Sequence, residues 1–224
     1  MSTKASTLRP AFAGATIRPV APGDVQSAFA QAAAEDGIVL GNASFDWLCE
    51  QGHVGLERVA RARRDPALAG PVTAALERLE GIHLRLNGDV SVLHASRENL
   101  LLPVDLVHEP TGTVLALDGS PHFTSFRLAA LELYPVDASI GFDLDEHKEL
   151  CRAWCATTDG LAGGLAAKGF GFGGITRERA YRDALLDLGA PAMGHPPVVR
   201  VAVVDGDGTA GYRRHRASLR ALLG

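Results

Sequence analysis

Residues 101–123 read LLPVDLVHEPTGTVLALDGSPHF and decide the predicted fold. Leu101–His108 and Thr113–Asp118 are largely apolar segments of strand length. Glu109-Pro110-Thr111-Gly112 stands between them, and its proline and glycine favour a turn. The stretch therefore predicts an antiparallel hairpin, which can bring Asp105 and Asp118 to the same end of a sheet.

A second hairpin is predicted immediately before this one. Ile82, Leu84 and Leu86 alternate with polar residues on one side of Asn87-Gly88, and the segment 90–94 alternates on the other side. Asn-Gly between two alternating segments is a strong hairpin signal. The two hairpins together predict an antiparallel meander of four strands.

The later part of the chain alternates helical patterns with one more strand. Helices are predicted for residues 125–134, 145–157, 176–189 and 212–223, and an apolar strand for Val198–Val204. This order predicts an α/β protein in which helices flank a mixed sheet, made of the meander and the late strand.

The N-terminal third is predicted to have a different character. Residues 1–23 contain three prolines and are expected to form a flexible tail. Residues 24–81 have helical periodicity and predict a helical appendage, so that residues 82–224 would form the α/β domain.

Composition limits the kind of protein. The chain has 224 residues, of which 46% are hydrophobic and 21% are charged, as in ordinary globular proteins. No segment has the length and apolarity of a membrane span, so no membrane partner is expected. The three cysteines are expected to be reduced thiols in a cytoplasmic protein. Because the net charge is −4, any contact with nucleic acid must be local.

The predicted hairpin places chemically useful groups together. Asp105 and Asp118 would form an oxygen-rich pocket of the kind that Mg²⁺ or Mn²⁺ prefers. Such a metal ion can stabilise charge on a phosphodiester and activate water. His122, just past the strand, could move a proton.

The stretch 101–128 resembles the PD-(D/E)XK, or restriction-endonuclease-like, superfamily, nearest the very-short-patch repair endonuclease branch. The matching features are Asp105, the strand ending in Asp118-Gly119, and His122. The resemblance implies a restriction-endonuclease-like mixed sheet and a metal-dependent phosphodiester hydrolase acting on DNA. It also implies a metal ligand in the backbone carbonyl of Leu117 and a site arginine in Arg127.

The sequence departs from the superfamily pattern at Ala116, where many relatives carry a glutamate. Two other hypotheses therefore stay open. One is a non-nuclease enzyme on the same scaffold that acts on a small polar metabolite, with a small anionic metabolite as its partner, through acid-base chemistry by Asp105, His122 and Arg127. The other is a degenerate, non-catalytic binding module, in which Asp105 and Asp118 serve only the local turns.

Several cations outside the hairpin are candidate substrate-binding residues. Lys168 lies in a glycine-rich loop, and Arg179 and Arg182 lie on the helix predicted at 176–189, where they could hold a phosphate or carboxylate.

His147, Cys151 and Cys155 follow one another at four-residue spacing. The first and last would lie about 12 Å apart on a helix, so the sequence favours partly buried thiols over a zinc site.

Overall fold

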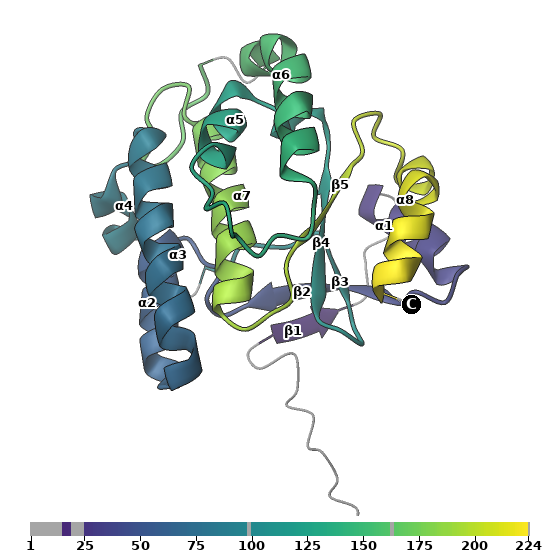
Figure 1. Cartoon of the computed structure of the whole chain (residues 1–224). Coiled ribbons are helices and arrows are strands. Elements are labelled where there is room, and N and C mark those ends of the chain that lie inside the picture. The colour runs from purple at the N-terminus through teal and green to yellow at the C-terminus, as the bar shows by residue number, and fades with distance from the viewer. Residues whose placement is uncertain (1–14, 19–24, 98–99, 162–163, 224) are drawn as a thin grey trace, which may run out of the picture.

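The computed structural model describes residues 15–18, 25–97, 100–161 and 164–223, which form an α/β fold (Figure 1). In chain order the elements are β1 (Ala15–Arg18), α1 (Val25–Ala34), β2 (Leu40–Phe45), α2 (Gly52–Arg63), α3 (Pro66–Arg85), α4 (Val90–Ala95), β3 (Leu106–His108), β4 (Thr113–Asp118), the 3₁₀ helix η1 (Ser120–His122), α5 (Ser125–Leu131), α6 (Leu144–Leu161), α7 (Ile175–Ala192), β5 (Val199–Ala202) and α8 (Gly208–Leu223).

The strands form a mixed sheet in the order β1-β2-β3-β4-β5. β2, β3 and β4 form an antiparallel meander, and β5 pairs parallel to β4, with Leu115 opposite Val199. β1 extends the sheet by pairing antiparallel with residues 42–45 of β2. The chain between β4 and β5 contains α5, α6 and α7, so a helical crossover provides the parallel pairing, as parallel strands require.

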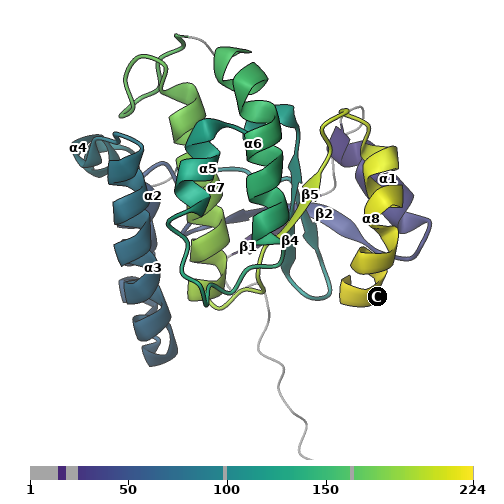
Figure 2. The ribbon, with the colours of Figure 1, turned by 45° about the horizontal axis from the view of Figure 1, so that its top comes forward.

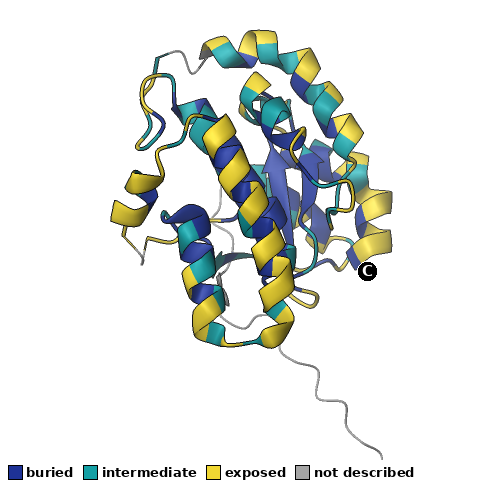
Figure 3. Ribbon diagram, turned by 60° about the vertical axis from the view of Figure 1, so that its left-hand side comes forward, coloured by how far each residue is buried: buried dark blue, intermediate teal, exposed yellow. Residues whose placement is uncertain are grey.

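Helices cover both faces of the sheet (Figures 1 and 2). α1 and α8 pack together on one face, where Phe29 and Tyr212 join Leu115 and Val201 in one apolar cluster. α5, α6 and α7 cover the other face, and α3 packs on the outer side of α7. The sheet is buried between these layers, whereas the outer helices expose one side to solvent (Figure 3). Polar side chains at the ends of β4 and β5 are consequently shielded from water.

The hairpin predicted at 82–94 is wrong. α3 continues to Arg85, because Leu79, Ile82 and Leu86 are buried at helical spacing, whereas Leu84 is 73% exposed. Asn87 adopts a left-handed conformation (φ 58°) and ends the helix. The N–H of Asn87 bonds to the carbonyl of Leu84, and that of Gly88 to the carbonyl of His83. Asn-Gly therefore forms a helix C-cap here instead of a hairpin turn.

Two other predictions need correction in the N-terminal third. Residues 24–81 are helical in α1, α2 and most of α3, but residues 40–45 form β2 and pair with β1 and β3. Residues 15–18 of the expected tail form β1, and the rest of that tail lies outside the described residues. The strand that precedes β3 in the meander is thus β2. Its residues alternate in burial, but its sequence LGNASF contains few residues that favour strands.

The remaining predicted elements are confirmed, with shifted ends. β3 and β4 form the predicted hairpin around 109–112, although β3 begins only at Leu106. The four later helices correspond to α5, α6, α7 and α8, and the apolar strand to β5. Within the described part of the chain, no helix is long and apolar enough to cross a membrane.

Candidate functional site

Asp118 lies at the end of β4 on the face of the sheet that α5, α6 and α7 cover. Side chains of a strand alternate between faces. Leu115 and Leu117 join the cluster beneath α1 and α8, whereas Val114 and Ala116 join the larger core on the opposite side. Asp118 continues this second set and is only 1% exposed. A carboxylate at such a position needs polar partners.

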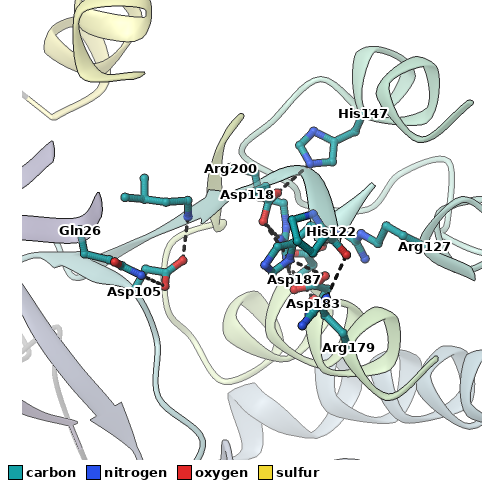
Figure 4. Close-up of polar contacts among 12 residues, drawn as sticks. Gln26, Asp105, Asp118, His122, Arg127, His147, Arg179, Asp183, Asp187 and Arg200 are labelled. Carbon is teal, nitrogen blue, oxygen red and sulfur yellow. Dashed lines mark hydrogen bonds and ion pairs between the residues drawn. The ribbon is translucent and has the colours of Figure 1, made fainter. Parts of the chain in front are cut away.

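Arg200 of β5 is the principal partner of Asp118 (Figure 4). Its Nη1 donates to Asp118 Oδ1 at 2.7 Å, its Nη2 to Asp183 Oδ1 at 3.2 Å, and its Nε to Asp187 Oδ1 at 2.8 Å. Asp183 and Asp187 are four residues apart on α7 and so share a helix face. One fully buried guanidinium therefore joins carboxylates from a strand and a helix.

A second buried arginine completes this network. Arg127 of α5 donates from Nη2 to Asp187 Oδ2 at 2.6 Å and from Nη1 to the Tyr134 hydroxyl at 2.9 Å. The hydroxyl of Tyr134 in turn donates to Asp187 Oδ2 at 2.7 Å. Three aspartates and two arginines give the network a formal charge of −1, which a protonated histidine can neutralise.

Two histidines contact the carboxylates of this network. His147 of α6 is buried, with Nε2 at 2.9 Å from Asp118 Oδ2. His122 of η1 places Nδ1 at 3.2 Å from Asp183 Oδ2 and 3.4 Å from Asp118 Oδ1. The imidazole of His122 is 29% exposed, against 7% for His147. His122 is therefore the more exposed of the two histidines.

The charges of the network shift the pKa values in opposite directions. Burial alone would raise the pKa of Asp118, but Arg200, the hydrogen bond with His147 and the charge of His122 lower that pKa to about 2. Arg200 and His122 likewise lower the pKa of Asp183 against the effect of burial. Burial disfavours the His122 imidazolium, but Asp183 and Asp118 outweigh this effect and raise the pKa of His122. Near neutral pH, His122 thus faces ionised carboxylates and holds a proton more strongly than usual.

Asp105 does not join Asp118, contrary to the sequence-based expectation. Its Oδ2 accepts the backbone N–H of Leu117 at 2.8 Å, and its Oδ1 accepts Nε2 of Gln26 at 3.0 Å. Figure 4 shows Asp105 turned away from the network around Arg200. The reason is that β3 begins only at Leu106, which pairs with Leu115 of β4. Residues 116–118 of β4 therefore extend beyond β3, and the Asp105 side chain accepts the N–H of Leu117 there. The expected metal pocket of Asp105, Asp118 and the Leu117 carbonyl is therefore not assembled.

The other predicted site residues are dispersed. Arg127 is 1% exposed and bonds to Asp187 and Tyr134, so burial keeps it from a substrate and it positions other groups. Arg179 donates from Nη1 to the carbonyl of Pro121, next to His122, at 3.1 Å. Lys168 and Arg182 line a separate small cleft that does not include His122. Only Arg179 of the predicted substrate-binding residues is thus close to His122.

Sequence reasoning missed most of the network: Tyr134, His147, Asp183, Asp187 and Arg200. One signal was available, because Arg200 is the single charge inside the apolar strand Val198–Val204. A charge in a buried strand implies buried partners of the opposite sign. The sequence places His147 at helical spacing from Cys151 and Cys155, whereas the structure pairs it with Asp118.

The structure assembles a different set of possible metal ligands from the expected one. Ligand atoms of Asp118, His122 and Asp183 lie within 4.8 Å of one another, as a metal site requires. However, all four carboxylate oxygens already have partners: Arg200 on both Oδ1 atoms, His147 on Asp118 Oδ2, and His122 on Asp183 Oδ2. Mg²⁺ favours six oxygen ligands, whereas one of these three ligands is an imidazole nitrogen. Arg200 already supplies the positive charge that a metal ion would bring.

Comparisons with protein-family models, with curated proteins and with solved structures find no match to this chain.

Proposed function

We propose that this protein is an enzyme in which His122 acts as general acid and base on a phosphate ester, without a metal ion. The observation that carries the proposal is the position of His122. Its Nδ1 lies against two ionised carboxylates, and its ring is partly exposed. Because Nδ1 donates to Asp183, Nε2 of the neutral ring is an acceptor that can take a proton from water or a hydroxyl group.

The network behind His122 supports this role. Asp183 and Asp118 orient the imidazole and stabilise its protonated form, as the carboxylate does in histidine-carboxylate pairs of hydrolases. Arg200 and Arg127 keep the carboxylates ionised and fixed, because each guanidinium is buried and hydrogen-bonded to them. Asp183 and Asp118 raise the pKa of His122 above its ordinary value, which favours the protonated imidazole that acts as general acid.

The anionic class of substrate follows from Arg179. This guanidinium lies beside His122 through its bond to Pro121, and its remaining N–H groups can bind a phosphate.

The scaffold also agrees with the restriction-endonuclease-like fold that the sequence resembles, since an antiparallel meander is followed by a late strand beside β4. A cytoplasmic location agrees with the free thiols of Cys151 and Cys155.

The test is hydrolysis of p-nitrophenyl phosphate, bis-p-nitrophenyl phosphate and supercoiled plasmid DNA, each with EDTA and with Mg²⁺ or Mn²⁺. We expect turnover in EDTA that falls about 100-fold or more in His122→Asn. His94→Asn is the matched control on the exposed surface of α4, and it should keep full activity.

Two results would contradict the proposal. Turnover that requires Mg²⁺ or Mn²⁺ would favour the metal-dependent nuclease that the resemblance implies. The absence of turnover with all three substrates, in folded protein, would favour the non-catalytic binding module.

A further inference from the structure

A cavity of about 200 Å³ lies between α6, β5 and α8, and His122 is not among the residues that line it. β5 is the last strand of the sheet, and Figures 1 and 2 show it between these two helices. All four residues of β5 line the cavity. The cavity therefore opens on the edge of the sheet that has no further strand.

Backbone acceptors of this edge point into the cavity. The N–H of Val203 bonds to the carbonyl of Asp118, and Val201 is paired with Leu117. In a parallel ladder, alternate residues of a strand bond to the same neighbour. Val201 and Val203 thus bond toward β4, and both the carbonyl and the N–H groups of Arg200 and Ala202 point the opposite way. These carbonyl oxygens offer hydrogen-bond acceptors to a ligand.

His147 adds a buried acceptor. It is 5% exposed and lines the cavity, while its Nε2 lies at 2.9 Å from Asp118. Because the Asp118 carboxylate accepts from Nε2, Nδ1 is the ring nitrogen that remains for a ligand. No described residue forms a hydrogen bond with Nδ1.

The charge of the cavity is negative. Asp143 and Glu146, at the start of α6, lie at its mouth, and the lining contains no lysine. Its one arginine is Arg200, whose guanidinium is turned away into the aspartate network. Burial lowers the pKa of His215, so this histidine adds no positive charge at neutral pH. Phe142, Leu150 and Leu219 provide apolar walls.

We propose that this cavity binds an alkylammonium group, a primary amine on an apolar chain. The ammonium group would donate to His147 Nδ1 and to an edge carbonyl of β5, with Glu146 providing the opposite charge. The chain would lie between Phe142 and Leu219. An ammonium group has three donors and no acceptor, which matches a cavity that combines several acceptors with net negative charge. The amine belongs to a free diamine or to a lysine side chain of a peptide.

Binding of n-butylammonium, with n-butanol as its neutral analogue, tests the proposal. We expect n-butylammonium to shift the imidazole NMR signals of His147 in a saturable way, and n-butanol to shift them far less. Glu146→Gln should raise the dissociation constant about three- to fivefold, because it removes one exposed ionic contact. Asp145→Asn is the matched control, since Asp145 is 94% exposed on the same turn and does not line the cavity.

The source of the amine is resolved by comparing cadaverine with the peptide acetyl-Leu-Lys-Leu-amide and its Nε-acetyllysine form. Tighter binding of cadaverine assigns the site to free amines, and tighter binding of the unmodified peptide assigns it to lysine side chains. Equal shifts with butanol and butylammonium would overturn the proposal, as would equal effects of Glu146→Gln and Asp145→Asn. His122→Asn should still bind the amine, so failure here is separate from failure of the proposed catalysis.

Discussion

Asp187→Asn is the change that tests the buried network most severely. Asp187 is fully buried and accepts from Arg200 at 2.8 Å, from Arg127 at 2.6 Å and from Tyr134 at 2.7 Å. Asparagine has nearly the same shape, but it carries no charge and turns an amide N–H₂ toward one of these donors. Both guanidiniums lose part of their counter-charge in a place that water does not reach. Removal of one partner from a buried ionic network costs about 3–5 kcal/mol.

The magnitude can be read from urea unfolding followed by far-UV circular dichroism. With a denaturant slope of about 2–3 kcal/mol/M, a loss of about 3–5 kcal/mol moves the midpoint down by about 1–2.5 M urea. Glu178→Gln is the control on the same helix, because it breaks the partly exposed pair with Arg182 and should cost less than about 1 kcal/mol. If Asp187→Asn costs no more than Glu178→Gln, the network does not hold the fold as we describe it.

Two further perturbations probe other parts of the structure. His83 is 3% exposed, and burial lowers its pKa to about 4, so the folded state favours its neutral form. The free energy of unfolding should therefore keep its full value above pH 6.5 and fall by up to about 3 kcal/mol as the pH drops toward 4. The variant His83→Phe should lose this pH dependence. An unchanged acid profile in that variant would refute the assignment to His83. EDTA should leave the melting temperature unchanged and Mn²⁺ should not raise it, because Arg200 occupies the carboxylates that a metal ion would need. A melting temperature that rises with the Mn²⁺ concentration would show a metal site.

The sequence predicts the part of the fold that depends on local signals. The hairpin of β3 and β4 is recognisable because strand, turn and strand are contiguous in residues 101–118. The prediction of a four-stranded meander fails at Asn87-Gly88, because this dipeptide suits both a hairpin turn and a helix C-cap. The apolar residues Ile82 and Leu86 also fit both the two-residue period of a strand and the period of a helix. Only the tertiary position of Leu84, which solvent reaches, distinguishes them.

The candidate site depends on long-range pairing and is predicted less well. Asp118 and His122 are close in sequence, and the structure keeps them together. Asp183 and Arg200 reach them only because the crossover through α7 returns the chain as β5 beside β4. No spacing in the sequence reveals that register. Asp105 illustrates the converse, since its place in the motif gives no information on the N–H of Leu117 that it caps.

The most direct test of the account is an NMR titration of the His122 imidazole, with its nitrogen signals assigned. We expect a pKa above 6.5 for His122, a neutral form protonated at Nδ1, and a lower pKa in Asp183→Asn. A pKa below 6.5, or a neutral form protonated at Nε2, would contradict the claim that ionised aspartates hold His122 ready for proton transfer.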